Sequence, residues 1–98
     1  MKKIVKSAYA GTLESSDVYI QVKPLEEEKI DISLESSVEE LYGEDIKKLV
    51  LNTLEKMEIS FICVEIQDKG ALDLVIKARL QAAIFRACEC DPEWEVLS

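Results

Sequence analysis

The sequence predicts a small α+β domain: a two-layer sandwich in which a mixed or antiparallel sheet of about four strands has two helices on one face. Three observations support this prediction. The 98 residues fit a single domain with one modest core. Hydrophobic residues make up 48% and charged residues 33% of the chain, an ordinary globular balance. Apolar positions follow strand or helix periods in the order strand, strand, strand, helix, strand, helix.

The strands are predicted from residues that alternate between apolar and polar, as in a sheet with one buried face. Residues 3–9 alternate weakly and predict the first strand, and residues 18–22 predict the second. Residues 30–34 predict the third, and because only a charged turn separates it from the second, we expect these two to form a hairpin. Residues 61–66 are apolar on both faces except at Glu65, which is typical of a central, well-covered strand.

Two segments have the spacing of amphipathic helices. The first runs from about residue 44 to residue 57, and its apolar face comprises Ile46, Leu49, Val50, Leu54 and Met57. The second begins near Ala71 and stops before Pro92, and its apolar stripe comprises Leu72, Val75, Ile76, Leu80, Ala83 and Ile84. Before the first helix, Ser36 and Ser37 with Glu39 and Glu40 have the pattern of a capping box, which predicts a short turn there.

Charge and hydropathy argue against two classes of partner. The net charge is -8, from 20 acidic and 12 basic residues, whereas a nucleic-acid surface needs an excess of Lys and Arg. No apolar run approaches the roughly 20 residues that a membrane-spanning helix requires. The residues after Met1 form no apolar segment of the kind found in signal peptides. We therefore expect a cytoplasmic protein that binds neither nucleic acid nor membrane.

The chain lacks most of the residue combinations that form catalytic and metal sites. It contains no His, so neither a Ser-His nor a Cys-His pair is available. Cys63, Cys88 and Cys90 are expected to be free thiols, with Cys63 buried and the other two in a loose tail over residues 88–98. Cys88 and Cys90 are too close in sequence for the usual paired zinc ligands. No catalytic residue and no metal ligand is predicted.

One polar loop, residues 11–17, contains two adjacent hydroxyl side chains between predicted strands. Its residues alone are explained by a turn in which Ser and Asp side chains cap backbone amides. The alternative explanation is that one of the two hydroxyls has a function.

Three stretches of the sequence resemble the acyl carrier proteins of citrate lyase. They are residues 10–18 (Ala-Gly-Thr-Leu-Glu-Ser-Ser-Asp-Val), residues 35–39 (Glu-Ser-Ser-Val-Glu) followed by Tyr-Gly-Glu, and residues 68–73 (Asp-Lys-Gly-Ala-Leu-Asp) followed by residues 78–83 (Ala-Arg-Leu-Gln-Ala-Ala). The resemblance extends from about residue 4 to residue 87. It implies a single acyl carrier domain over residues 1–98, with a core at about 3–87.

The resemblance implies that the chain carries an acyl group on a covalently attached arm. In that family the serine of the Leu-Glu-Ser element carries 2′-(5″-phosphoribosyl)-3′-dephospho-CoA through a phosphodiester, and by position this serine is Ser15. The thiol of that arm holds acetyl and citryl thioesters while citrate is cleaved to acetate and oxaloacetate. The implied partners are the alpha subunit (acetyl-ACP:citrate transferase), the beta subunit (citryl-ACP lyase), the holo-ACP synthase that attaches the arm, and an acetyl ligase. The chain itself is then a carrier and not an enzyme.

The carrier role that the resemblance implies suggests what the neighbours of Ser15 do. We expect Leu13 to anchor the loop to the core, and Glu14 and Asp17 to serve transferase recognition or amide capping. The turn at residues 68–73 is interpreted as a helix start. Two alternatives remain: an acyl carrier of malonate decarboxylase, which uses the same kind of arm, and an α+β interaction module that carries no covalent group.

Overall fold

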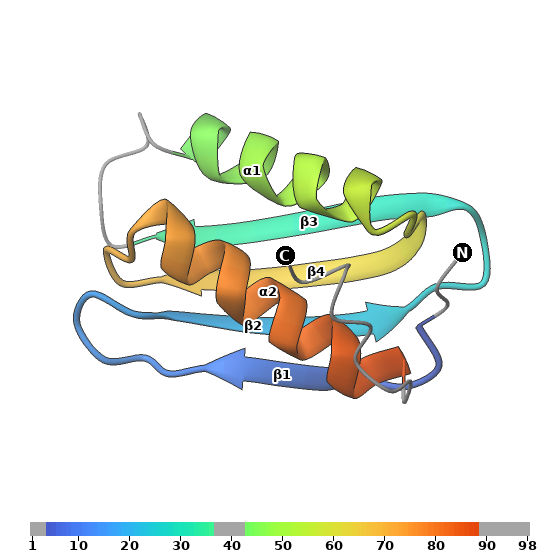
Figure 1. Cartoon of the computed structure of the whole chain (residues 1–98), viewed down its shortest axis with the longest axis horizontal. Helices are drawn as coiled ribbons and strands as arrows, with labels where there is room; N and C mark the ends of the chain where they lie inside the picture. Colours follow the sequence, from blue (N-terminus) through green and yellow to red (C-terminus); the bar gives the residue numbers. More distant parts are fainter. Residues whose placement is uncertain (1–3, 37–42, 89–98) are drawn as a thin grey trace.

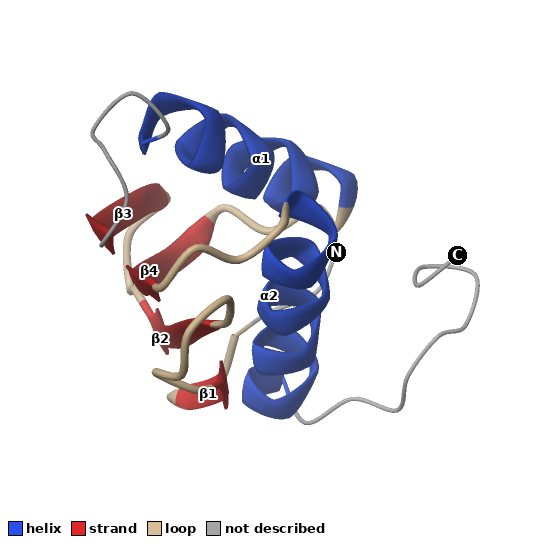
Figure 2. Ribbon diagram, turned by 90° about the vertical axis from the view of Figure 1, so that its left-hand side faces the viewer, coloured by secondary structure: helices blue, strands red, loops and turns tan. Residues whose placement is uncertain are grey.

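The computed structural model describes residues 4–36 and 43–88 of the chain. The elements are four strands and two helices: β1 (Ala8–Gly11), β2 (Val18–Pro24), β3 (Lys29–Ser36), α1 (Gly43–Lys56), β4 (Phe61–Asp68) and α2 (Asp73–Cys88). The strands form one mixed sheet, and both helices lie on the same face of it (Figures 1 and 2). The predicted fold class, a two-layer α+β sandwich, is confirmed.

The strand order in the sheet is β1-β2-β4-β3, which differs from the sequence order. Strand β4 pairs with β2 in antiparallel and with β3 in parallel orientation, while β1 pairs with β2 in antiparallel orientation. The predicted hairpin of the second and third strands is therefore wrong, because β4 lies between them. Parallel neighbours need a crossover connection, and α1 supplies it between β3 and β4.

The two faces of the sheet are buried to different degrees. On the face toward the helices, β2 contributes Val18, Ile20 and Val22, and β4 contributes Ile62, Val64 and Ile66, all buried. On the opposite face, Phe61, Cys63 and Glu65 of β4 are only half-buried. Strand β4 is central as predicted, but the expectation that it is covered on both faces, with Cys63 buried, is wrong. Both helices pack on one side, so that alternate residues of β4 are left partly open to solvent.

The helices are close to the predicted segments, but the expectation for Cys88 is wrong: it is the last residue of α2 and is disulfide-bonded, not a free thiol in a loose tail. Helix α1 buries Ile46, Val50 and Leu54, as the spacing predicts, and α2 buries Ile76, Leu80, Ala83, Ile84 and Ala87. Leu72 was predicted to lie on the buried stripe of α2 but is exposed, because the helix begins at Asp73, two residues later than predicted. Of the predicted capping box, Ser36 is the last residue of β3, and the rest lies outside the described residues.

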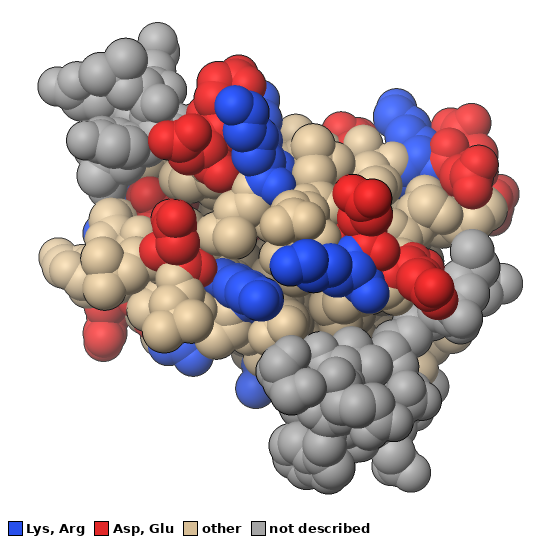
Figure 3. Space-filling view, turned by 45° about the horizontal axis from the view of Figure 1, so that its top comes forward, with Lys and Arg blue, Asp and Glu red and all other residues tan. Residues whose placement is uncertain are grey.

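Charged side chains cover much of the surface over the helices. Figure 3 shows acidic and basic side chains interspersed on this face. Within the described parts of the chain, no helix has both the length and the apolar character needed to cross a membrane.

Candidate functional site

Ser15 lies in the loop that joins β1 to β2, at one end of the sheet (Figure 1). Its side chain is exposed, and it forms no hydrogen bond within the described residues. Two neighbours adopt left-handed backbone conformations: Gly11 with φ 94° and Ser16 with φ 65°. A Cβ atom at Gly11 would clash with the carbonyl oxygen of Val18, so only glycine fits there. The loop thus turns sharply and leaves the Ser15 hydroxyl exposed.

Asp17 holds the two sides of this loop together. The Thr12 hydroxyl donates a hydrogen bond of 2.7 Å to Oδ2 of Asp17, and the Val18 amide donates one of 2.7 Å to Oδ1. Arg79 of α2 donates to both oxygens, from Nε at 3.2 Å and from Nη2 at 3.0 Å. The amide capping expected of Asp17 is present, and the ion pair with Arg79 ties the loop to the helix layer.

These contacts stabilise the charged form of Asp17. The hydrogen bond from Thr12, followed by those from the Val18 amide and from Arg79, lowers the pKa of Asp17 from 3.8 to about 2. With both oxygens occupied and a low pKa, this carboxylate is a weak base. Asp17 is therefore suited to fixing the shape of the loop and not to accepting a proton from Ser15.

The segment between β4 and α2 holds the other side of the loop. The Ser16 amide donates to the carbonyl oxygen of Lys69 at 2.8 Å, and the Lys69 amide donates to the carbonyl oxygen of Asp17 at 2.9 Å. This short ladder brings two of the motif stretches noted in the sequence, residues 10–18 and 68–73, into direct contact.

Asp68 in turn shapes that segment. Its side chain is only 2% exposed, and its Oδ1 accepts hydrogen bonds from the amides of Gly70 at 3.2 Å and Ala71 at 3.0 Å. Oδ2 accepts a hydrogen bond of 3.0 Å from the Ser36 hydroxyl. Asp68 therefore orients the backbone of Lys69, which holds the Ser15 loop. Sequence reasoning assigned the turn at residues 68–73 only to the start of a helix.

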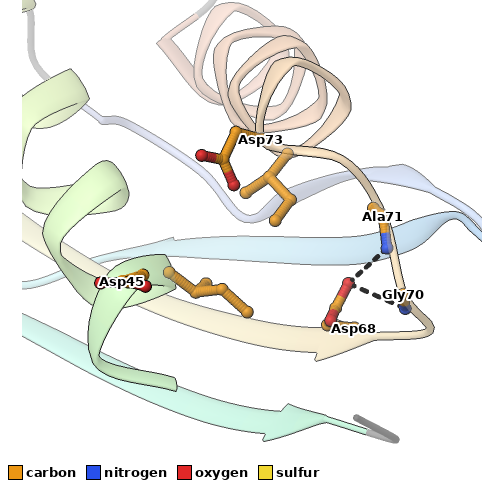
Figure 4. A pocket seen from close by; sticks show the side chains of 7 residues that line it. Asp45, Asp68, Gly70, Ala71 and Asp73 are labelled. Atoms are coloured by element: carbon orange, nitrogen blue, oxygen red, sulfur yellow. Dashed lines mark hydrogen bonds between the residues drawn. The ribbon is translucent and has the colours of Figure 1, made fainter. Parts of the chain in front are cut away.

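A hollow of about 570 Å³ lies beside this turn, between the starts of α1 and α2. Its lining includes Asp45, Asp68 and Asp73, and Figure 4 shows these carboxylates on three different elements. Among the described residues, no group of side chains is arranged to hold a metal ion. The hollow is thus an acidic depression close to the Ser15 loop.

The role expected of Leu13 is wrong. Its side chain is exposed and does not anchor the loop to the core. The anchor is instead the pair of Asp17 and Arg79, which are separated by 62 residues in the sequence. Arg79 lies in one of the resembling stretches, but nothing in its spacing indicated which carboxylate it would contact.

Comparison with known proteins defines the class of this protein. Residues 5–87 match the family described as the malonate decarboxylase delta subunit, a family of acyl carrier proteins. The fold also resembles a chain in the crystal structure of a Pseudomonas malonate decarboxylase hetero-tetramer in complex with malonate, with a TM-score of 0.77 and 20% identity over 88% of each chain. At that identity, the second match shows a common fold.

Curated relatives are more specific. The chain is 47% identical over 97 residues to the citrate lyase acyl carrier protein of Vibrio cholerae, covering 98% of this chain and 99% of the relative. It is 49% identical over 96 residues to that of Cronobacter sakazakii, covering 97% and 98%. The chain belongs to the citrate lyase acyl carrier protein family. The carriers of this family are non-catalytic subunits of lyase complexes, and membership implies a covalently attached prosthetic group.

Proposed function

We propose that this chain is the acyl carrier subunit of a citrate lyase and that Ser15 carries its prosthetic group through a phosphodiester. The observation that supports Ser15 most directly is its geometry. The hydroxyl is exposed and has no hydrogen-bond partner within the described residues, whereas the backbone around it is fixed by Asp17 and Lys69. A nucleophile on a rigid, accessible loop suits an enzyme that must modify it.

The residues present fit an arm attached at this position. Attachment joins the Ser15 Oγ to a phosphorus atom of an activated phosphate donor, expels the donor's phosphate leaving group and releases the hydroxyl proton. Asp17 is a weak base with both oxygens occupied, so the base that accepts this proton has to come from the attaching enzyme. The carrier supplies the hydroxyl and a fixed backbone around it.

The group that best fits this role is 2′-(5″-phosphoribosyl)-3′-dephospho-CoA, whose terminal thiol carries acetyl or citryl as a thioester. Its partners are then the alpha and beta subunits of citrate lyase, the holo-ACP synthase and an acetyl ligase. Tethering raises the local concentration of the acyl group at both active sites. We take the carrier domain to be about residues 3–87, which the family match over residues 5–87 supports.

A second candidate is the carrier of malonate decarboxylase. The matching family is described as a malonate decarboxylase subunit, and the fold is shared with a chain of the Pseudomonas malonate decarboxylase. Both observations support a relationship between the two kinds of carrier. The full-length relatives at 45–49% identity are named citrate lyase acyl carrier proteins, and this favours citrate lyase. Copurification of the native protein with subunits that cleave citrate, and not with subunits that decarboxylate malonate, would decide between them.

The first prediction concerns the attachment site. In cells that ferment citrate, the intact mass of the native protein should exceed the mass of the chain by that of the arm, with the addition located on Ser15 by fragmentation. Ser15→Ala should abolish the addition because it removes the hydroxyl nucleophile. Ser16→Ala is the matched control and should be modified like the wild type. An unmodified wild-type chain would favour the interaction module, and modification that persists in S15A would exclude Ser15.

A further inference from the structure

Three exposed leucines lie in or beside the loop that carries Ser15. Leu13 lies within the loop and is 55% exposed, while Leu72 and Leu74 are 76% and 78% exposed at the start of α2. The Ser15 loop and the segment before α2 are joined by the backbone hydrogen bonds of Lys69, so the three leucines belong to one end of the molecule (Figure 1). Leucines this exposed and grouped at one end are typical of a surface that another protein covers. We call this group the leucine surface.

Leu72 occupies a position where leucine is locally unfavourable. Helix α2 begins at Asp73, and the carbonyl oxygen of Leu72 accepts hydrogen bonds from the amides of Val75 at 2.9 Å and Ile76 at 3.1 Å. Leu72 is therefore the N-cap residue, a position that prefers Ser, Thr, Asp or Asn because their oxygens accept bonds from free helix amides. Neither capping nor burial explains a leucine there, and a residue that breaks local rules is expected at functional sites.

Acidic side chains lie beside the leucine surface. Glu14 in the loop, Asp73 in the first turn of α2 and Asp45 in the first turn of α1 are all exposed, and the last two line the acidic hollow. At the left end of Figure 3, uncharged side chains project from the surface with acidic side chains nearby. Lys69 adds one exposed positive charge. The complementary surface is apolar and bordered by Lys or Arg.

We propose that the leucine surface and its acidic border form the docking site for the enzyme that attaches the arm to Ser15. This inference rests on the proposed function. To form the phosphodiester, that enzyme must bring a phosphorus atom within bonding distance of the Ser15 Oγ, so it has to cover the segments beside the loop. The lyase subunits act at the thiol end of the arm and need no such close approach. The attaching enzyme also binds a phosphorylated donor, for which it needs basic residues near its active site, and these complement an acidic carrier surface.

The experiment compares leucine variants of the full chain as substrates of the purified holo-ACP synthase and its activated phosphoribosyl-dephospho-CoA donor. The variants are Leu72→Ser, Leu74→Ser and the two combined. Serine at position 72 suits the N-cap, so this variant should fold at least as stably as the wild type. Leu51→Ser is the matched control, because Leu51 is also an exposed leucine (43%) but lies away from the Ser15 loop. It lines a groove with Ser60, next to the start of β4, whereas the Ser15 loop lies at the end of β4.

The double variant should lose about ten-fold or more in kcat/KM for arm attachment, as expected when apolar anchors of an interface are removed. Its thermal unfolding should match that of the wild type, and Leu51→Ser should be modified within about two-fold of the wild-type rate. Normal attachment to folded leucine variants would overturn the docking site and leave the carrier function intact. Normal attachment with slowed citrate cleavage would also overturn it and assign the surface to the lyase subunits. If wild-type Ser15 accepts no arm, it is the proposed function that fails.

Discussion

At the scale of single residues, the Ser15 loop depends on a carboxylate that is fixed in its charged form. Asp17 accepts hydrogen bonds from Thr12, from the Val18 amide and from Arg79, and each of these bonds favours the ionised group. A carboxylate whose pKa is lowered by folding stabilises the folded state at pH values above its unfolded pKa. That contribution is lost as the pH falls through the folded pKa.

Replacing Asp17 should make the stability of the fold depend less on pH in the acidic range. The pKa of Asp17 is lowered from its ordinary value of 3.8 to about 2 in the folded state. The wild type should therefore be more stable than Asp17→Asn at neutral pH. The difference in free energy of unfolding between the two should shrink as the pH falls from about 4 to about 2. Urea unfolding at several pH values measures it. Glu14→Gln, which removes an exposed neighbouring carboxylate, is the matched control. A difference for D17N that stays constant down to pH 2 would contradict the role of the charge.

At the scale of elements, two connections far apart in the sequence act as one unit. Asp68 shapes the turn that follows β4, and the backbone of Lys69 in this turn pairs with residues 16 and 17 of the loop between β1 and β2. The loop therefore takes its shape from the end of a central strand. This provides a rigid support for Ser15 without a hydrogen bond to its hydroxyl within the described residues.

The prediction for Asp68 tests this coupling. Asp68→Ala removes a buried acceptor and leaves the amides of Gly70 and Ala71 and the Ser36 hydroxyl without this partner, so it should destabilise the fold by about 2–3 kcal/mol. Urea unfolding measures this loss. Hydrogen exchange of the Ser16 amide, which donates to Lys69, should become faster than in the wild type. Gln67→Ala, at an exposed neighbouring position, is the control. A Ser16 amide that stays equally protected in D68A would show that the loop does not depend on the turn.

At the scale of the whole molecule, the sequence predicted the elements better than their pairing. Alternation and helical spacing report on each segment alone, and they predicted three of the four strands and both helices close to their observed bounds. The weakly alternating first strand was predicted at residues 3–9 and instead lies at Ala8–Gly11. The pairing of strands depends on contacts between distant segments, so a short connection between the second and third strands led to a wrong hairpin. Contacts between distant segments were also missed at the site. The resemblance indicated Ser15, but the spacing of residues gave no sign of the contact between Asp17 and Arg79.

The last prediction concerns the two faces of the central strand. Ile62 and Cys63 are neighbours in β4, but the Ile62 side chain is fully buried under the helices and that of Cys63 is half-buried on the opposite face. Ile62→Ala should cost about 2–5 kcal/mol because it leaves a cavity in the core, and Cys63→Ala should cost less than about 1 kcal/mol. Urea unfolding of both variants provides the measurement. Since small domains have only about 5–15 kcal/mol of stability, the first loss would be a large share of the total. Equal losses would mean that a partner or a second layer covers the open face. The carrier would then have a second buried surface away from the helices, and a copy of the chain or a subunit of the complex would be the first candidate to cover it.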